Sequence, residues 1–158
     1  IKNIKTMKKD KKVKENKYSS GLAIIFNNKI LLGHCTGRKI NTGFGIPKGE
    51  IDKNESKIEA AIRETKEEFG LLVPENLINT KEYEFKVKTS SYNKTVYYYV
   101  LSINSVSEIG LTKNYIPKEQ LQIEEVDSAE FMDKELALKC ITKSQIPLIE
   151  NLIKLNLL

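Results

Sequence analysis

The chain has few cysteines, which cross-link many small proteins, and it lacks long apolar runs, which anchor proteins in membranes. It contains two cysteines, Cys35 and Cys140, which are far apart in the sequence. Such a pair forms neither a disulfide framework nor a zinc-binding pattern and is typical of reduced thiols in the cytosol. No apolar run approaches the roughly 18 residues of a membrane span, and the lysine-rich start lacks the apolar segment of a secretory signal. The sequence therefore predicts a cytoplasmic protein without a membrane partner.

Histidine and arginine are also scarce. His34 is the single histidine. It follows a predicted strand, matches no motif, and is expected to have a structural role. The two arginines are Arg38 and Arg63, and Arg63 lies in a segment rich in glutamate.

The net charge of +5 is concentrated at one end of the chain. Residues 1–17 hold eight lysines against Asp10 and Glu15, whereas the remaining residues are nearly neutral. We expect residues 1–17 to be a flexible basic tail, acting as a solubilising arm or as an electrostatic arm for RNA or a polyphosphate. Residues 18–158 are long enough to bury the core of a single domain.

Apolar patterns and turn residues divide this domain into short elements. Asn27-Asn28 is expected to turn a hairpin, and Asn54 or Ser56 to cap a helix. The apolar stripe of the last helix is expected to pack in the core. Strands are predicted over residues 20–26, 29–33, 44–46, 82–88, 95–103 and around 130–131, and helices over residues 56–69, 134–140 and 145–155.

The most informative segment is residues 49–71, GEIDKNESKIEAAIRETKEEFGL. At roughly 100° per residue, its glutamates Glu64, Glu67 and Glu68 lie on one side of a helix, opposite a mostly apolar stripe. Three carboxylates this close repel one another unless a cation neutralises them. Mg²⁺ or Mn²⁺ suits this role because both prefer oxygen ligands. A solvated acidic helix face is the alternative, and it is what most charge runs are.

The spacing favours the metal-binding interpretation. The fixed positions are Gly, five residues, Glu, seven residues, Arg-Glu, two residues, Glu-Glu, one residue and Gly. This pattern resembles the signature box of the Nudix hydrolases along its full length, with Thr65 at a position where an aliphatic residue is more usual. The resemblance implies an α/β fold, an α/β/α sandwich around a mixed β-sheet. It also implies Mg²⁺-dependent attack by water on a nucleoside diphosphate linked to another group.

The resemblance assigns roles to individual residues of the box. It implies that Glu64, Glu67 and Glu68 hold the metal, with the carbonyl of Gly49 as a further ligand. Glu55 and Arg63 would form an ion pair that braces the loop against the helix, and Gly70 would cap the helix.

The residues just before the box narrow the substrate class. The segment Gly43-Phe44-Gly45-Ile46-Pro47-Lys48-Gly49 lacks both the third glycine of a dinucleotide fingerprint and the Lys-[Ser/Thr] ending of a P-loop. Its Pro-Lys-Gly ending resembles the dinucleoside polyphosphate hydrolases and the relatives that act on RNA 5′ ends. This likeness makes Lys48 and Phe44 candidate substrate contacts, with Lys48 on the phosphates. A plain surface lysine is the alternative for Lys48.

A tyrosine-rich segment offers further candidates. Lys94-Thr95-Val96 is similar to a strand of the dinucleoside polyphosphate hydrolases, which implies a substrate contact for Lys94. The three tyrosines that follow alternate between the faces of a strand, with Tyr97 and Tyr99 on one face and Tyr98 on the other. One face would pack in the core and the other would stack on a nucleobase. Alternatively, all three are ordinary strand formers.

Glu125 is a further candidate. It lies six residues before Phe131, and members of the family often have a glutamate at this distance ahead of an aromatic residue. The resemblance makes Glu125 a candidate general base or additional metal ligand, although Glu64 is equally suited to be the base. A surface carboxylate is the alternative.

The expected activity is metal-dependent hydrolysis of a phosphoanhydride, most simply of dinucleoside polyphosphates such as diadenosine tetraphosphate. Two substrate alternatives remain open: the 5′ end of RNA, by pyrophosphohydrolysis or decapping, and ADP-ribose or a nucleoside triphosphate. A nucleotide-binding protein without turnover is a third alternative, which the intact box disfavours. The oligomeric state is left open by the sequence.

Overall fold

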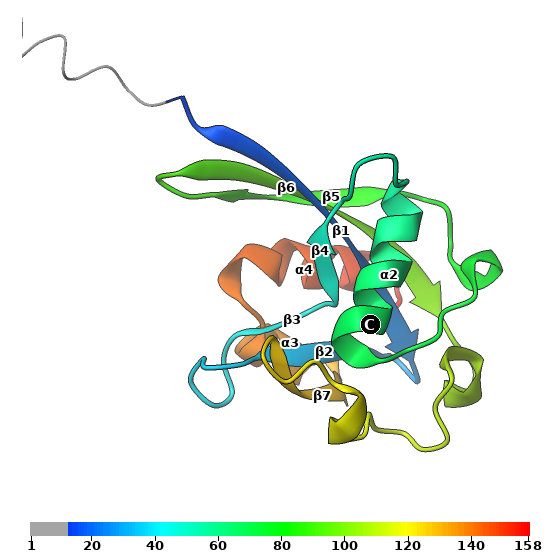
Figure 1. Ribbon diagram of the computed structural model, residues 1–158. Helices are drawn as coiled ribbons and strands as arrows, with labels where there is room; N and C mark the ends of the chain where they lie inside the picture. Colours follow the sequence, from blue (N-terminus) through cyan, green and yellow to red (C-terminus); the bar gives the residue numbers. More distant parts are fainter. Residues whose placement is uncertain (1–12) are drawn as a thin grey trace, which may run out of the picture.

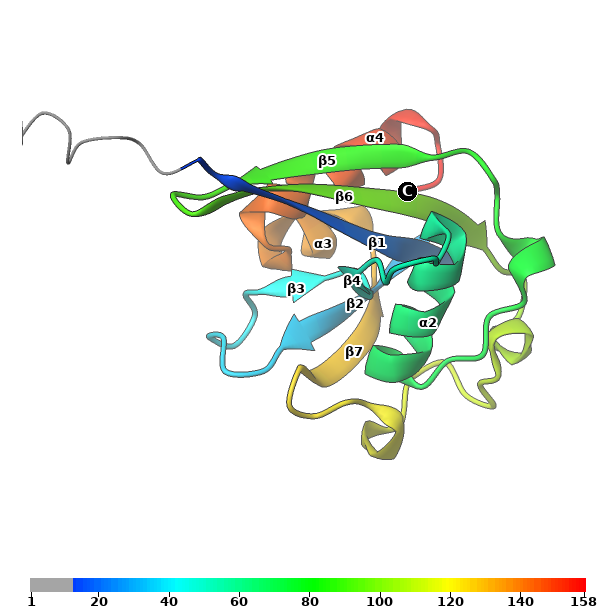
Figure 2. The ribbon, with the colours of Figure 1, turned by 45° about the horizontal axis from the view of Figure 1, so that its top comes forward.

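The computed structural model describes residues 13–158 (Figure 1). A seven-stranded mixed sheet lies between α2 on one face and α3 and α4 on the other (Figure 2), which confirms the predicted α/β/α sandwich. The helices are α2 (Lys57–Phe69), α3 (Lys134–Cys140) and α4 (Ile146–Lys154). The strands are β1 (Glu15–Phe26), β2 (Lys29–Cys35), β3 (Phe44–Gly45), β4 (Lys48–Glu50), β5 (Tyr83–Lys88), β6 (Tyr92–Ser102) and β7 (Val126–Met132).

Strand β1 is the centre of the sheet. Along one edge it pairs with β6 in parallel from Glu15 to Ile25, and along the other it pairs antiparallel with β2 near its end and with β4 near its middle. The order β3-β2-β1-β6-β5 is completed by β7, which pairs with β2. Because β4 lies beside β1, the residues just before the glutamate-rich helix are fixed to the middle of the sheet.

Alternation along β1 supplies a core to each face of the sheet. Leu22 and Ile24 face α2, whereas Ala23 and Ile25 face α3 and α4. On the second face, α4 buries Leu148 and its neighbours, so the apolar stripe of the last helix packs in the core as expected. Two apolar layers of this kind hold the sheet rigid, and the site is built at its edge.

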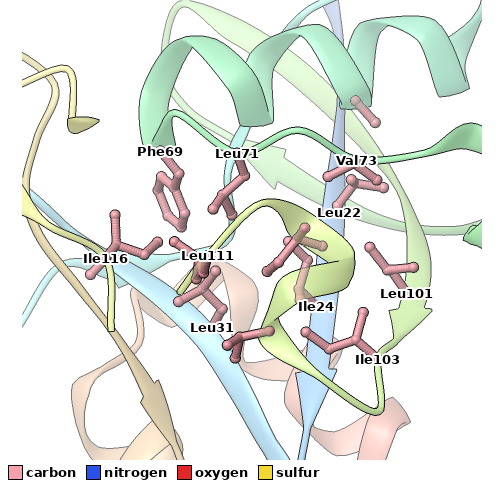
Figure 3. Packing of buried hydrophobic residues seen from close by; sticks show 14 of the residues in the cluster. Leu22, Ile24, Leu31, Phe69, Leu71, Val73, Leu101, Ile103, Leu111 and Ile116 are labelled. Carbon is pink, nitrogen blue, oxygen red and sulfur yellow. The ribbon is translucent and has the colours of Figure 1, made fainter. Parts of the chain in front are cut away.

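Helix α2 begins and ends with strong local signals. Ser56 caps it through a capping box with Glu59, and Gly70 ends it with a φ of 67° in the left-handed region. The buried Thr65 hydroxyl donates to the carbonyl of Ala61 at 2.7 Å, so this polar side chain is accommodated on the apolar face. Phe69 lies between the helix end and the sheet (Figure 3). These contacts fix the rotation of α2 and therefore the direction in which its carboxylates point.

The structure confirms most predicted elements and lengthens several of them. Asn27 and Asn28 both have positive φ, as the predicted two-residue turn requires. Strand β6 begins at Tyr92, three residues before the predicted start at residue 95, and β4 was not predicted. Strand β1 begins at Glu15, so the expected boundary after residue 17 falls inside a strand. The predicted flexibility of residues 1–12 lies outside the described residues.

Candidate active site

Arg63 organises the glutamates of α2. Its Nε and Nη2 donate to both carboxylate oxygens of Glu55 at 2.8 and 3.0 Å, and Nη2 also donates to the carbonyl of Glu50 at 2.9 Å. Its Nη1 donates to Glu64 at 2.9 Å and to Glu67 at 3.2 Å. Hydrogen bonds to these carboxylates raise the pKa of Arg63, which stays charged. The predicted pair of Glu55 and Arg63 is thus present and ties the loop to the helix.

We expect Glu55→Gln to lower kcat by about tenfold with a small loss of stability, because it weakens the brace without touching substrate. Steady-state kinetics and thermal unfolding measure the two effects. Asp52→Asn is the matched control, since Asp52 lies 3.4 Å from Arg63 Nε and is mostly exposed. A larger effect for Asp52→Asn than for Glu55→Gln would contradict the assigned brace.

Gly49 in β4 lies directly under the Glu64 carboxylate. A Cβ atom added at Gly49 would overlap the carboxyl carbon and both oxygens of Glu64. Any side chain at this position would push the Glu64 carboxylate aside, so glycine lets the backbone of β4 lie close to the acidic face of α2 without displacing it.

Glu68 is the most buried carboxylate of the three. It accepts a hydrogen bond from the backbone N–H of Lys48 at 3.0 Å. Burial raises its pKa to about 7, aided by the negative charges of Glu64 and Glu125 and opposed by the Lys48 N–H. Burial also raises the pKa of Glu64, against the lowering effect of Arg63. In the metal-free protein, both carboxyl groups are therefore harder to ionise than an exposed glutamate.

The three glutamates and Gly49 line one cavity of 510 Å³, together with residues of β1, β6 and the loop before β7. A second cavity of 300 Å³ adjoins it and is lined by apolar and polar side chains, among them Ile46, Val87 and Gln145. We call them the acidic cavity and the upper cavity. Both are lined by the same five residues, which makes them parts of one cleft: Lys48, Glu68, Tyr92, Lys94 and Glu125.

Three lysines from three strands surround the acidic cavity. Lys17 comes from β1, Lys48 from β4 and Lys94 from β6. Burial lowers the pKa of Lys94, and the adjacent positive charge of Lys48 lowers it further. Two ammonium groups held together next to carboxylates are suited to binding the oxygens of a phosphate chain.

The donor set fits a divalent metal. Glu64, Glu67 and Glu68 offer hard oxygen ligands into one cavity, and Ser19 Oγ in the same lining is buried without a hydrogen-bond partner among residues 13–158. In the described part of the chain, no three acidic, histidine or cysteine side chains already surround a common point. Arg63 Nη1 holds Glu64 and Glu67 in their present positions, so gathering the three carboxylates around one ion requires their side chains to rearrange.

The structure corrects two predictions about aromatic residues. Tyr98 and Tyr99 are both buried, at 2% and 4% exposure, and lie in opposite cores. Neither of these two side chains is left for stacking on a base, because the sheet is covered on both faces at Tyr98 and Tyr99. Tyr97 is half-buried under Lys57 Nζ, outside the cleft. Phe44 is also buried, and its ring packs against His34 rather than the cleft.

Several cleft residues were not predicted from the sequence. Tyr92 lines both cavities, and Lys17 Nζ lies 4.7 Å from the centre of its ring. Arg38 and Gln145 line the upper cavity from segments more than 100 residues apart. The pairing of β1 with β6 places Lys17 opposite Lys94, and no local pattern indicates that contact.

Comparisons with solved structures find the same fold in enzymes of low sequence identity. The C. elegans Ap4A hydrolase in a binary complex has a TM-score of 0.65 and 20% identity over 89% of this chain and 97% of that chain. The MutT protein of Methanosarcina mazei Go1 has a TM-score of 0.66 and 15% identity over 90% and 96%. A bifunctional NMN adenylyltransferase/ADP ribose pyrophosphatase from Francisella tularensis, complexed with AMP and a Mn ion, has a TM-score of 0.65 and 13% identity over 97% and 45%. A comparison with curated protein sequences finds no match.

No helix among residues 13–158 is long and apolar enough to cross a membrane. A sequence model of the NUDIX domain matches residues 18–152, which include the whole glutamate-rich pattern and the strands around the cleft. Because this match covers most of the chain, the protein belongs to the Nudix family and is a pyrophosphohydrolase.

Proposed function

We propose that the protein hydrolyses dinucleoside polyphosphates such as diadenosine tetraphosphate in the presence of Mg²⁺. The observation that carries the proposal is the two-part cleft, in which carboxylates and lysines surround one cavity and a less charged cavity adjoins it. The first suits a metal and a phosphate chain, and the second is large enough for a nucleoside. The structural likeness to an Ap4A hydrolase is consistent with this substrate class, although it concerns the fold alone.

The lysines bind and orient the phosphate chain. Burial lowers the pKa of Lys94, and the positive charge of Lys48 lowers it further because the two ammonium groups repel each other in the free protein. The negative charge of a phosphate bound between them offsets this repulsion. Because the fold already holds the two lysines together, binding the phosphate does not have to bring them together. Lys17, beside Tyr92, extends the basic surface along β1.

Glu64, Glu67, Glu68 and the carbonyl of Gly49 are the proposed ligands of Mg²⁺ or Mn²⁺. A metal held by these groups would polarise phosphate oxygens and lower the pKa of the attacking water. Glu125 is exposed on the loop before β7 and lines both cavities, so it can accept a proton from water inside the cleft. Glu64 is the alternative base, and its raised pKa fits that role as well.

Product analysis tests the proposal directly. The protein is incubated with diadenosine tetraphosphate and Mg²⁺, with EDTA as a control, and the products are separated by ion-exchange chromatography. ATP and AMP formed only in the presence of metal would support both the metal dependence and the substrate class. Intact substrate in the presence of metal would exclude this class.

RNA with a 5′-triphosphate is the second candidate, favoured by one observation. The lysine-rich residues 1–12 lie two residues before β1 in the sequence, and Lys17 of β1 lines the acidic cavity. Deleting residues 1–12 leaves β1 whole and is therefore the appropriate truncation. Loss of activity on RNA, with activity on dinucleotides unchanged, would support the RNA substrate; equal activities before and after truncation would count against a role for the tail.

We expect Lys94→Met to raise KM by about tenfold with little change in kcat, because it removes a charge-assisted contact to the phosphates. The fold should tolerate the change, since it also removes the repulsion between Lys94 and Lys48. Lys88→Met is the control, because Lys88 is an exposed lysine of the same hairpin outside both cavities. Equal KM values for the two variants would refute the phosphate contact.

A further inference from the structure

The loop of residues 36–42, between β2 and β3, carries Arg38 to the upper cavity. The backbone N–H of Arg38 donates to the carbonyl of Cys35 at 3.1 Å, which closes a tight turn. Gly43 has a φ of 69°, and a Cβ added there would overlap the Arg38 side chain. Within residues 13–158, Arg38 has no ion-pair partner. The guanidinium of Arg38, which lines a cavity large enough for a nucleoside, is thus free to contact a ligand.

His34, at the end of β2, ties this loop to β7. It is buried, with an exposure of 8%. Its Nδ1 lies 2.6 Å from Asp127 Oδ1, and its Nε2 lies 3.2 Å from the carbonyl oxygen of Lys39. A carboxylate and a carbonyl only accept hydrogen bonds, so both ring nitrogens must donate. A neutral imidazole has one N–H and can make only one of these bonds, whereas the imidazolium makes both.

A β-bulge aims Asp127 at the imidazole. His34 pairs with Ser128 and Cys35 with Val126, which leaves Asp127 as the extra residue of β7. Such a bulge redirects a side chain that regular pairing would have turned elsewhere. The bulge therefore makes the contact between His34 and Asp127 a specific feature of this sheet.

Thr36 strengthens the same connection. Its backbone N–H donates to the Glu125 carbonyl at 3.0 Å, and its hydroxyl donates to the Ile123 carbonyl at 2.6 Å. The Arg38 loop and the segment that carries Glu125 are therefore fastened to each other, with the imidazole of His34 at the buried end of the contact.

We propose that protonated His34 is a positioning residue: by donating to Asp127 and to the Lys39 carbonyl, it holds the loop so that Arg38 contacts the nucleotide in the upper cavity. The inference rests on the proposed binding of a nucleotide in this cleft. The charged groups that act on His34 are Asp127 from β7 and Arg38 from the loop, while β3 contributes the ring of Phe44.

The direction of the pH dependence follows from these contacts. Burial lowers the pKa of His34, but the hydrogen bonds to Asp127 and the Lys39 carbonyl and the charge of Asp127 outweigh it, so that the pKa lies above 6.5. The contribution of the imidazolium is complete below pH 6.5 and is lost as the pH rises through the raised pKa. Loop fixation should therefore weaken on the alkaline side.

NMR titration tests the ionic state without any substrate. Because His34 is the single histidine, one imidazole C–H signal reports on it without assignment. We expect this signal to titrate above pH 6.5 in the wild type and at a lower pH in Asp127→Asn, where the carboxylate no longer opposes the effect of burial. Titration at or below pH 6.5 in the wild type would overturn the proposal, even for a fully active enzyme.

Kinetics test the connection to Arg38. We expect Arg38→Ala to raise KM about tenfold without changing kcat. In the wild type, KM should rise as the pH increases through the pKa of His34, whereas in Arg38→Ala this rise in KM should be absent.

The titration of Glu68 affects both proteins equally, so its effect on KM cancels in the comparison. Identical KM profiles in the two would refute the positioning role. Inactivity on every nucleotide tested, with the NMR result as expected, would instead count against the proposed function.

Discussion

Glu68→Gln is expected to lower kcat by a factor on the order of 10³ while the protein stays folded. The carboxylate lies at the junction of the two cavities, and the amide that replaces it is a poor ligand for Mg²⁺. Initial rates with saturating Mg²⁺ and nucleotide measure the effect. We expect Glu67→Gln to act in the same direction, because both side chains belong to the same ligand set.

The fold should persist because glutamine keeps the shape of a protonated glutamate and can still accept the Lys48 N–H. With a pKa of about 7 in the folded protein and 4.5 as the reference, ionisation of Glu68 makes the metal-free protein less stable as the pH rises between these values. The loss amounts to about 3 kcal/mol at most. In EDTA at pH 8, the variant should therefore unfold at a higher temperature than the wild type.

Glu150→Gln is the matched control, since Glu150 is exposed on α4, on the opposite face of the sheet. It should change neither kcat nor the unfolding temperature. Turnover near the wild-type rate in both Glu67→Gln and Glu68→Gln at saturating Mg²⁺ would refute the assignment of the metal ligands.

Gly49→Ala is expected to lower kcat by about two orders of magnitude, with a much smaller effect on stability. The added methyl group would occupy the place of the Glu64 carboxylate. A carboxylate at the end of a flexible side chain can move aside at low cost, so the fold survives, but a proposed metal ligand is displaced. Gly21→Ala is the comparison variant, because its added Cβ would meet the backbone carbonyl of Pro47, which cannot move aside as a side chain can. Gly21→Ala should lower the unfolding temperature far more.

A double-mutant cycle shows whether Gly49 acts through Glu64. If it does, Gly49→Ala should have little further effect on kcat in a protein that already carries Glu64→Gln. Additive losses in the double variant would mean that the methyl group disturbs the cleft by another route.

The sequence predicted those parts of the site whose partners are close in the chain. The Ser56 and Gly70 caps are set within one helical turn, and Glu55 and Arg63 are eight residues apart. Their geometry follows from the helix period and from cap chemistry, which any chain with this spacing shares. The direction of the acidic face was therefore predictable before the sheet was known.

Residues that reach the cleft from distant segments were not predictable in this way. Arg38 and Gln145 meet at the upper cavity because the sheet brings β3 next to the segment before α4. Tyr98 and Tyr99 were expected to divide between core and substrate, but a sheet covered on both faces buries both. The alternation of side chains along a strand shows which residues share a face. Whether that face is buried depends on the helices that pack against it, and these come from distant parts of the chain.

The parallel pairing of β1 with β6 has a consequence for how the chain acquires its structure. β1 is made first but occupies the middle of the sheet, and its partner at Glu15 is Tyr92. During synthesis, one edge of β1 has no strand to pair with until the β6 segment has emerged. The central contact of the fold is also among its most distant in sequence, so loop closure should limit the folding rate more than helix formation does.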